Sequence, residues 1–138
     1  MDTWSEHLQL LATIATPIAV MLAWWQLRLS KRLSVVQFED AIAREYRDIA
    51  HALPIAALLG KELSVDAQAA SLGEFYRYID LTNGQVFLRS KGRITTTTWN
   101  DWREGICTLL KKPAFARAWN DIKEGAPDSF AELQRFEK

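Results

Sequence analysis

The chain has 138 residues, of which 49% are hydrophobic, and its seventeen Lys and Arg residues balance seventeen Asp and Glu residues. That length and composition predict one compact domain with an appendage and argue against a disordered chain. The zero net charge excludes a protein that binds nucleic acid through a globally basic field. One cysteine and two histidines exclude an intrachain disulfide framework and a Cys/His zinc site within one chain, so we expect no metal and no cofactor.

A long uncharged segment lies near the N-terminus. Residues 8–27 contain no Asp, Glu, Lys or Arg, and a helix of that length spans about 30 Å, the thickness of the hydrocarbon core of a bilayer. The residues at the end of this segment and just after it suit a membrane interface: Trp24, Trp25, Arg28, Lys31 and Arg32. Because the cations lie on the C-terminal side, the sequence predicts one transmembrane helix with the N-terminus outside and the C-terminus in the cytoplasm.

Small and polar residues share one face of this expected span. At 100° per residue that face contains Gln9, Ala12, Thr13, Thr16, Ala19 and Ala23. Small residues let helix backbones approach in lipid, and Thr and Gln can form hydrogen bonds between helices. We therefore expect a pore or oligomer interface there. The same residues dilute the apolar character of the segment, which leaves a buried helix of a soluble protein as the alternative.

A second helical pattern continues from the span without a break. Residues 29–53 lack Gly and Pro, and Val35, Phe38, Ile42, Ile49 and Leu53 keep helical spacing. Charges of both signs, beginning with Glu39 and Asp40, predict a solvated face rather than a catalytic carboxylate pair. The expected organisation is a transmembrane helix over residues 1–28, a helical stalk over 29–53 and a cytoplasmic helical domain over 54–138.

Turn residues divide the third part into further helices. A short apolar segment runs from Pro54 to Gly60, and a long helix is expected from Ser64 or Asp66 to about Ser90, with Gly92 as its C-cap. Phe75, Ile79 and Val86 would face the core. A hairpin over residues 78–90, turning at "TNGQ", is the alternative.

Three shorter helices are expected after residue 94. A threonine among residues 95–98 caps one that ends near Lys111 and Lys112, Pro113 begins the next, which closes at Gly125, and Pro127 and Asp128 start the last. The fold class is therefore all-α, with the N-terminal transmembrane helix continuing into the long stalk, followed by the small cytoplasmic helical bundle. The chain is expected to be oligomeric.

One local group of cations could hold phosphates. The candidate anionic-ligand patch consists of Arg89, Lys91, Arg93, Lys111 and Lys112, and its alternative is a set of cations that merely finish helices. Aromatic residues between Trp99 and Phe136 are interpreted as core rather than as stacking platforms. No nucleotide-binding, metalloprotease or serine-hydrolase motif is present, and Cys107 lies in apolar "GICTLL", so we expect no enzyme and no catalytic residues.

The segment "YIDLTNGQVFLRSKGRITTTTWNDWREGICTLLKKPAFARAWNDI" resembles small bacterial proteins with an N-terminal membrane helix and a helical domain. Their shared pattern is W-x-x-W-x-x-G-I…P-x-F-x-x-x-W, and the resemblance covers residues 78–136. It implies a pore-forming inner-membrane effector of a Hailong-type anti-phage system. The resemblance further implies a homo-oligomer, of which a tetramer is one form, and control by a nucleotide or short oligonucleotide ligand. No ligand-reading motif carries over residue by residue.

Two functional hypotheses follow from these observations. The first is a membrane-embedded oligomeric effector, with membrane lipid and copies of itself as partners, whose spans form a pore controlled at the cytoplasmic domain. The second is a single-pass adaptor that recruits a cytoplasmic partner without forming a pore. They differ in whether the polar side chains of the span face water.

Overall fold

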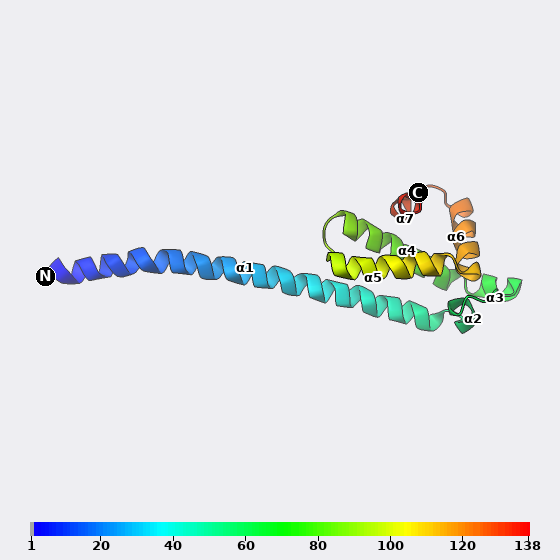
Figure 1. The fold of residues 1–138 in the computed structure, drawn as a ribbon, viewed down its shortest axis with the longest axis horizontal. Helices are drawn as coiled ribbons and strands as arrows, with labels where there is room; N and C mark the ends of the chain where they lie inside the picture. The colour runs from blue at the N-terminus through cyan, green and yellow to red at the C-terminus, as the bar shows by residue number, and fades with distance from the viewer. Residues whose placement is uncertain (1) are drawn as a thin grey trace. The chain divides into compact units, whose positions relative to one another are not determined.

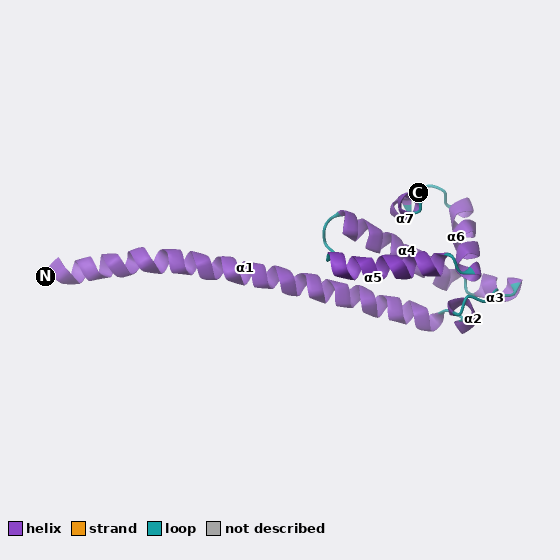
Figure 2. Ribbon diagram, viewed as in Figure 1, coloured by secondary structure: helices purple, strands orange, loops and turns teal. Residues whose placement is uncertain are grey.

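The computed structural model describes residues 2–138, apart from the side chains of residues 2 and 10–12. The described residues form helices joined by short loops and contain no strand (Figure 2). The first helix, α1, runs Asp2–Ala52 and includes Pro17. This continuous helix confirms the helical pattern expected on both sides of residue 28.

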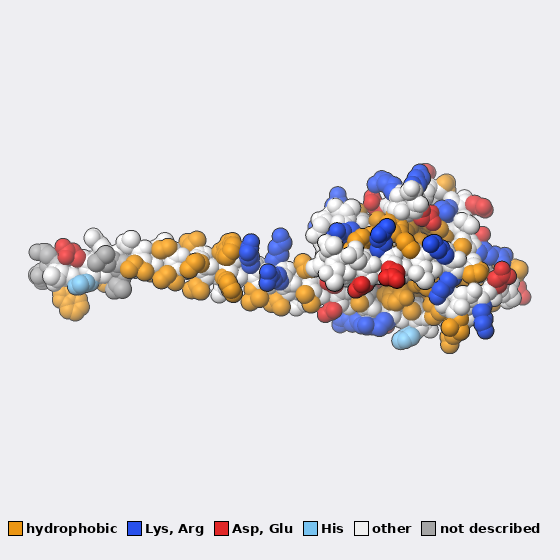
Figure 3. Space-filling model, viewed as in Figure 1, with side chains coloured by type: hydrophobic (Ala, Val, Ile, Leu, Met, Phe, Trp, Pro, Cys, Tyr) orange, Lys and Arg blue, Asp and Glu red, His pale blue; other side chains and the backbone are white. Residues whose placement is uncertain are grey.

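Backbone contacts divide the chain into two units, the first ending at Gln37 and the second comprising Phe38–Lys138. The first unit is the N-terminal part of α1. By length and composition, this is the one helix in residues 2–138 that could cross a bilayer. The most apolar 18-residue window within Thr3–Ala52 has a mean hydropathy of 1.6 and is 0% buried. Hydrophobic side chains lie along this part of α1, and Lys and Arg follow them (Figure 3).

The second unit packs the end of α1 with six more helices (Figure 1). They are α2 (Ile55–Leu58), α3 (Val65–Ala70), α4 (Leu72–Ser90), α5 (Thr96–Leu110), α6 (Pro113–Gly125) and α7 (Ala131–Phe136). Their buried residues form one core. Its largest fully buried apolar side chains are Phe75, Phe115, Ile49, Ile79 and Leu133.

Helix α4 settles the alternative between a helix and a hairpin over residues 78–90 in favour of the helix. Gly92 follows it with φ of +67°. The Gly92 N–H donates to the Arg89 carbonyl at 3.0 Å and the Arg93 N–H to the Leu88 carbonyl at 3.0 Å. This left-handed residue completes the cap expected at the end of the helix. Phe75 and Ile79 are buried as expected, and Val86 is partly buried against the core.

The single helix expected from Ser64 or Asp66 to Ser90 is wrong in one respect, because it is two helices. The backbone leaves the helical conformation at Ser71, with ψ of 3°. Before this break, the Gln68 Nε2 donates to the Ala114 carbonyl at 2.9 Å. That contact holds α3 against the start of α6, and α4 begins after the break.

The last helix also begins later than Pro127 or Asp128, because Phe130 has φ of 57° and interrupts the helical path. The Phe130 ring is buried and packs against Tyr76, at a centroid distance of 5.2 Å, and against Trp119, at 6.2 Å. A left-handed backbone costs a bulky residue about 1 kcal/mol or more, and this aromatic packing offsets it.

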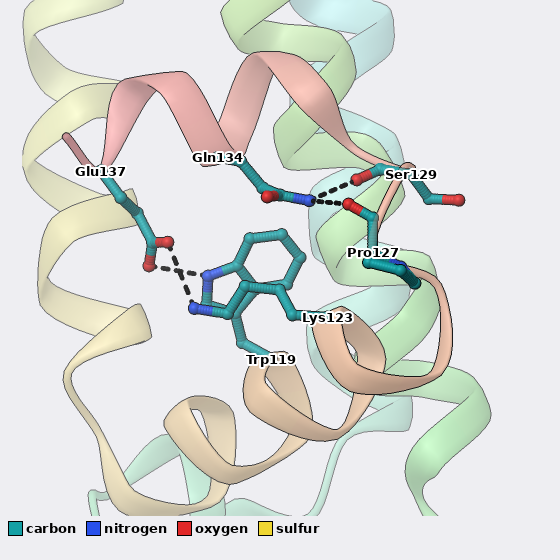
Figure 4. A network of polar contacts seen from close by, with 6 residues as sticks. All are labelled: Trp119, Lys123, Pro127, Ser129, Gln134 and Glu137. Atoms are coloured by element: carbon teal, nitrogen blue, oxygen red, sulfur yellow. Dashed lines mark hydrogen bonds and ion pairs between the residues drawn. The ribbon is translucent and has the colours of Figure 1, made fainter.

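Polar contacts hold α7 on α6 and α4. The Trp119 Nε1 donates to Glu137 Oε1 at 2.7 Å, and Lys123 Nζ lies 3.4 Å from Glu137 Oε2 (Figure 4). The Gln134 amide donates to the carbonyls of Pro127 and Ser129, at 2.9 and 2.8 Å. These bonds close the turn that precedes the helix.

Candidate functional site

The small face of the span is solvent-exposed in the described structure. Gln9, Thr13, Thr16, Ala19 and Ala23 are all exposed, whereas the side chain of Ala12 lies outside the described residues. The Thr13 hydroxyl donates to the Gln9 carbonyl at 2.7 Å, one helical turn earlier. This bond satisfies the hydroxyl donor within the helix, so Thr13 needs no water or second chain to pair it.

The expected interface anchors form a concave surface on α1. A hollow of about 190 Å³ is lined by Trp24, Trp25, Arg28, Leu29 and Arg32. The guanidinium carbon of Arg28 lies 4.4 Å from the centroid of the Trp24 ring, a cation–π contact. Lys31 is exposed and does not line the hollow. Tryptophan rings beside arginines are suited to the headgroup level of a membrane.

The candidate anionic-ligand patch divides into two groups. Arg89, Lys91 and Arg93 lie where α4 ends and α5 is about to begin, whereas Lys111 and Lys112 follow the other end of α5. Helix α5 has 15 residues, so it separates the groups by about 20 Å at 1.5 Å per residue. The five cations therefore do not surround one ligand.

Three cations of this set already have contacts within the folded unit. Arg89 donates from Nη1 to the Ile94 carbonyl at 3.1 Å and also contacts the Thr96 hydroxyl at 3.4 Å. Lys112 Nζ donates to the Leu58 carbonyl. Lys91 lies over the Phe87 ring at 5.4 Å. These contacts link loops and helix ends, which is the role expected if the cations finish helices and do not bind an anion.

Glu39 joins the end of α1 to the start of α5. Its carboxylate accepts a bond from the Thr95 N–H at 2.8 Å and one from the Thr98 hydroxyl at 2.8 Å. Burial raises the pKa of Glu39, but the hydrogen bonds from Thr95 and Thr98 outweigh burial and leave the pKa below its usual value of 4.5. The solvated face expected here therefore contains one half-buried acid that positions α5.

An open, mostly apolar cleft of about 180 Å³ lies between α1, α4 and α5 in the second unit. The lining residues are Ala43, Tyr46, Tyr78, Gln85, Asp101, Trp102, Gly105, Ile106 and Leu109. Burial raises the pKa of Tyr78 above its usual value of 10.0, so its hydroxyl stays protonated at neutral pH. Most aromatics between Trp99 and Phe136 pack in or on the core as expected, but Trp102 lines this cleft.

Gln85 is the unusual residue of the cleft. The residue is only 6% exposed, yet its side-chain amide makes no hydrogen bond to any described residue. Among residues 2–138, the fully enclosed side-chain atom that lacks a hydrogen-bond partner is Oε1 of Gln68. The Gln85 amide is not fully enclosed, so it can be reached from the cleft. Sequence reasoning missed Gln85, although its spacing from Phe75, Tyr78 and Thr82 places it on the buried face of α4.

The remaining reactive side chains are dispersed. Cys107 on α5 is a free, half-buried thiol, and His51 is exposed on α1. Within the part of the chain that the structure describes, no three His, Cys, Asp or Glu side chains are grouped so that they could hold a metal ion.

Comparison with protein-family models, with curated proteins and with solved structures finds no match for this chain. Two surfaces of the molecule itself therefore bear on its function: the exposed apolar part of α1 and the cleft beside Gln85.

Proposed function

We propose that the protein is a single-pass membrane protein whose spans associate and hold the folded unit at the cytoplasmic face. The observation that carries this proposal is the exposure of the apolar part of α1, where Met21 is 65% and Leu22 59% exposed. A core helix of a soluble protein buries such side chains, whereas lipid covers them in a membrane.

The aromatics at the end of the span and the cations there support the proposed orientation. Trp24 and Trp25 precede Arg28, Lys31 and Arg32, in the order of an aromatic belt followed by cytoplasmic cations. With one span in each chain, a helix interface in the membrane requires another chain. The small face with Ala19 and Ala23 suits close approach of a second copy.

The orientation is tested by reporter fusion. A cytoplasm-dependent reporter joined after Lys138 should be active, and the protein should remain in the membrane fraction after alkaline extraction. The control replaces Arg28, Lys31 and Arg32 with Glu, which removes the cation bias and should reduce correctly oriented protein. A C-terminus outside the cytoplasm, or release by alkali, would contradict the proposal.

Within this class, we propose first a pore-forming effector of bacterial anti-phage defence. Copies gathered along the small face would bring Gln9, Thr13 and Thr16 toward a common axis, where polar side chains can contact water. Control by a nucleotide at the full five-cation patch is not part of this proposal, because α5 separates the two groups of cations.

The second candidate is an adaptor without a pore, favoured by the hydrogen bond from the Thr13 hydroxyl to the Gln9 carbonyl. A span whose hydroxyl is satisfied internally can meet lipid or another helix directly. Dye release from vesicles that contain the purified protein distinguishes the candidates, since the effector permeabilises them and the adaptor leaves them sealed.

A further inference from the structure

We propose that the cleft between α1, α4 and α5 binds a small cationic aromatic ligand: one ring that carries an amide-like group and a positive charge. The inference goes beyond membrane anchoring, because every lining residue belongs to the folded unit. Binding there requires no bilayer, so its outcome and that of the proposed function are separate.

The size of the cleft selects a single ring. Its volume is about 180 Å³, and an apolar protein cavity of about 150 Å³ accommodates benzene. Ala43 and Gly105 line the cleft without bulky side chains, and a Cβ added at Gly105 would meet no heavy atom within 4 Å. One substituted ring fits this space, and the rest of a larger ligand would extend from its open mouth.

The walls of the cleft select an aromatic ligand. The Tyr46 and Tyr78 rings lie with centroids 6.4 Å apart and planes inclined by 60°, and Trp102 contributes a third aromatic side chain. Ile106 and Leu109 are buried beside them. Offset and edge-to-face contacts with such rings stabilise another aromatic ring beyond simple area burial.

Gln85 selects a hydrogen-bonding group on the ligand. Its amide has both donor and acceptor capacity, and a ligand that covers this amide without pairing it leaves the group unsatisfied, which disfavours binding. A primary amide or similar edge on the ligand donates to the Gln85 oxygen and accepts from its nitrogen. The Gln85 amide, which has no partner among the described residues, is therefore available to a ligand in the cleft.

Asp101 selects the charge of the ligand. It is the one charged residue that lines the cleft, it is exposed, and its carboxylate has no hydrogen-bond or ion-pair partner in residues 2–138. A cation at the mouth therefore gains attraction from this carboxylate and from the aromatic faces. An anionic ligand would be repelled, so the cleft does not suit a nucleotide phosphate.

The test measures binding of 3-(aminomethyl)benzamide to the full chain in lipid nanodiscs. We expect a dissociation constant of about 1 mM or lower, as for a ligand of this size with a well-placed ring and two polar groups. Gln85→Leu keeps a side chain of similar volume and removes the amide. It should therefore weaken binding of this probe about fivefold to tenfold. Benzylamine, which lacks the amide group, should bind this variant at least as tightly as the wild type.

Two further variants test the rest of the assignment. Gly105→Leu should abolish binding by filling the cleft, and Asp101→Asn should weaken binding of the probe most at low salt. The matched control is Asp121→Asn, an exposed acid on α6 outside the cleft. The ratio of the affinities for the probe and benzylamine does not depend on the folded fraction of a variant. The proposal would be overturned if Gln85→Leu left the ratio of the affinities for the probe and benzylamine unchanged, or if Gly105→Leu left the affinity for the probe unchanged. It would also be overturned if the wild type did not bind the probe at about 10 mM.

Discussion

Single side chains fix how the helices of the folded unit meet. Glu39 is the clearest case, because one carboxylate accepts bonds from both the backbone of Thr95 and the hydroxyl of Thr98. Thr95 is also the N-cap of α5 and accepts from the Thr98 N–H. The same four-residue segment therefore begins one helix and attaches it to another, which sets the register of α5 against α1.

Replacing Glu39 with Gln should destabilise the folded unit by about 1 kcal/mol at pH 7, because a neutral amide replaces a charged acceptor of two bonds. The pKa of Glu39 is lowered in the folded state. Its contribution is therefore present above the unfolded-state value near 4.5 and is lost as pH falls through the lower folded value. Denaturant unfolding at pH 7 and at successively lower pH values measures this effect.

Glu45 provides the matched control for that substitution. It is an exposed acid on the same helix and makes no hydrogen bond or ion pair with the described residues, so Glu45→Gln should change the free energy of unfolding little at any pH. The difference between the wild type and Glu39→Gln should shrink on acidification. A difference that is constant from pH 7 down to full protonation of the carboxylate would contradict the assignment.

Most helices of the folded unit could be predicted from local signals, and the exceptions depend on contacts distant in sequence. Thr95, Pro113 and Gly92 act within one turn of the helix ends that they mark, so the sequence alone locates those ends. The break at Ser71 and the late start of α7 accompany contacts of Gln68 with Ala114 and of the Phe130 ring with Trp119. No pattern of neighbouring residues in the sequence indicates these long-range contacts.

The cleft was unpredictable for the same reason. Trp102 and Gln85 lie 17 positions apart in sequence and come together only because α4 and α5 pack beside α1. Helical spacing shows that Gln85 faces inward, but whether a buried amide has a partner depends on the neighbouring helix. Likewise, the sequence identifies five nearby cations, whereas the length of α5 shows that they form two groups.

At the scale of an element, Leu133 is the fully buried side chain that α7 contributes to the core. Leu133 is 0% exposed, and its N–H donates to Asn83 Oδ1 on α4 at 3.0 Å. Leu133→Ala should destabilise the unit by about 3 kcal/mol through lost burial and a cavity. Arg135→Ala, which removes an exposed pair with Glu132 on the same helix, should cost about 0.5 kcal/mol or less.

Denaturant unfolding of the two variants measures the difference, and proteolysis near the C-terminus reports whether α7 detaches first. Equal effects of Leu133→Ala and Arg135→Ala would mean that α7 contributes little to the core. A large effect of Leu133→Ala with no increase in cleavage would mean that α7 unfolds only together with the other helices.

At the scale of the whole molecule, the two units differ in how their apolar side chains are covered. The folded unit has a core that includes Ile49, Phe75 and Phe115 and draws residues from α1, α2, α4, α5, α6 and α7. The apolar part of α1 has no such burial within one chain. In a bilayer, lipid covers the bulky side chains, and close contact with another helix is favourable only along a face where backbones approach. Assembly should therefore be encoded in the span.

Ala19 and Ala23 lie one helical turn apart on the small face, with Met21 on the opposite side of α1. Ala19→Leu or Ala23→Leu should weaken self-association of the full chain about fivefold, because a bulky side chain separates the backbones. Met21→Leu is the matched control, since it changes the side that we propose to face lipid with little change in volume. Crosslinking at graded ratios of protein to detergent measures the shift. Equal weakening by the substitutions on both faces would place the interface elsewhere on the span, and unchanged association in all three variants would assign assembly to the folded unit.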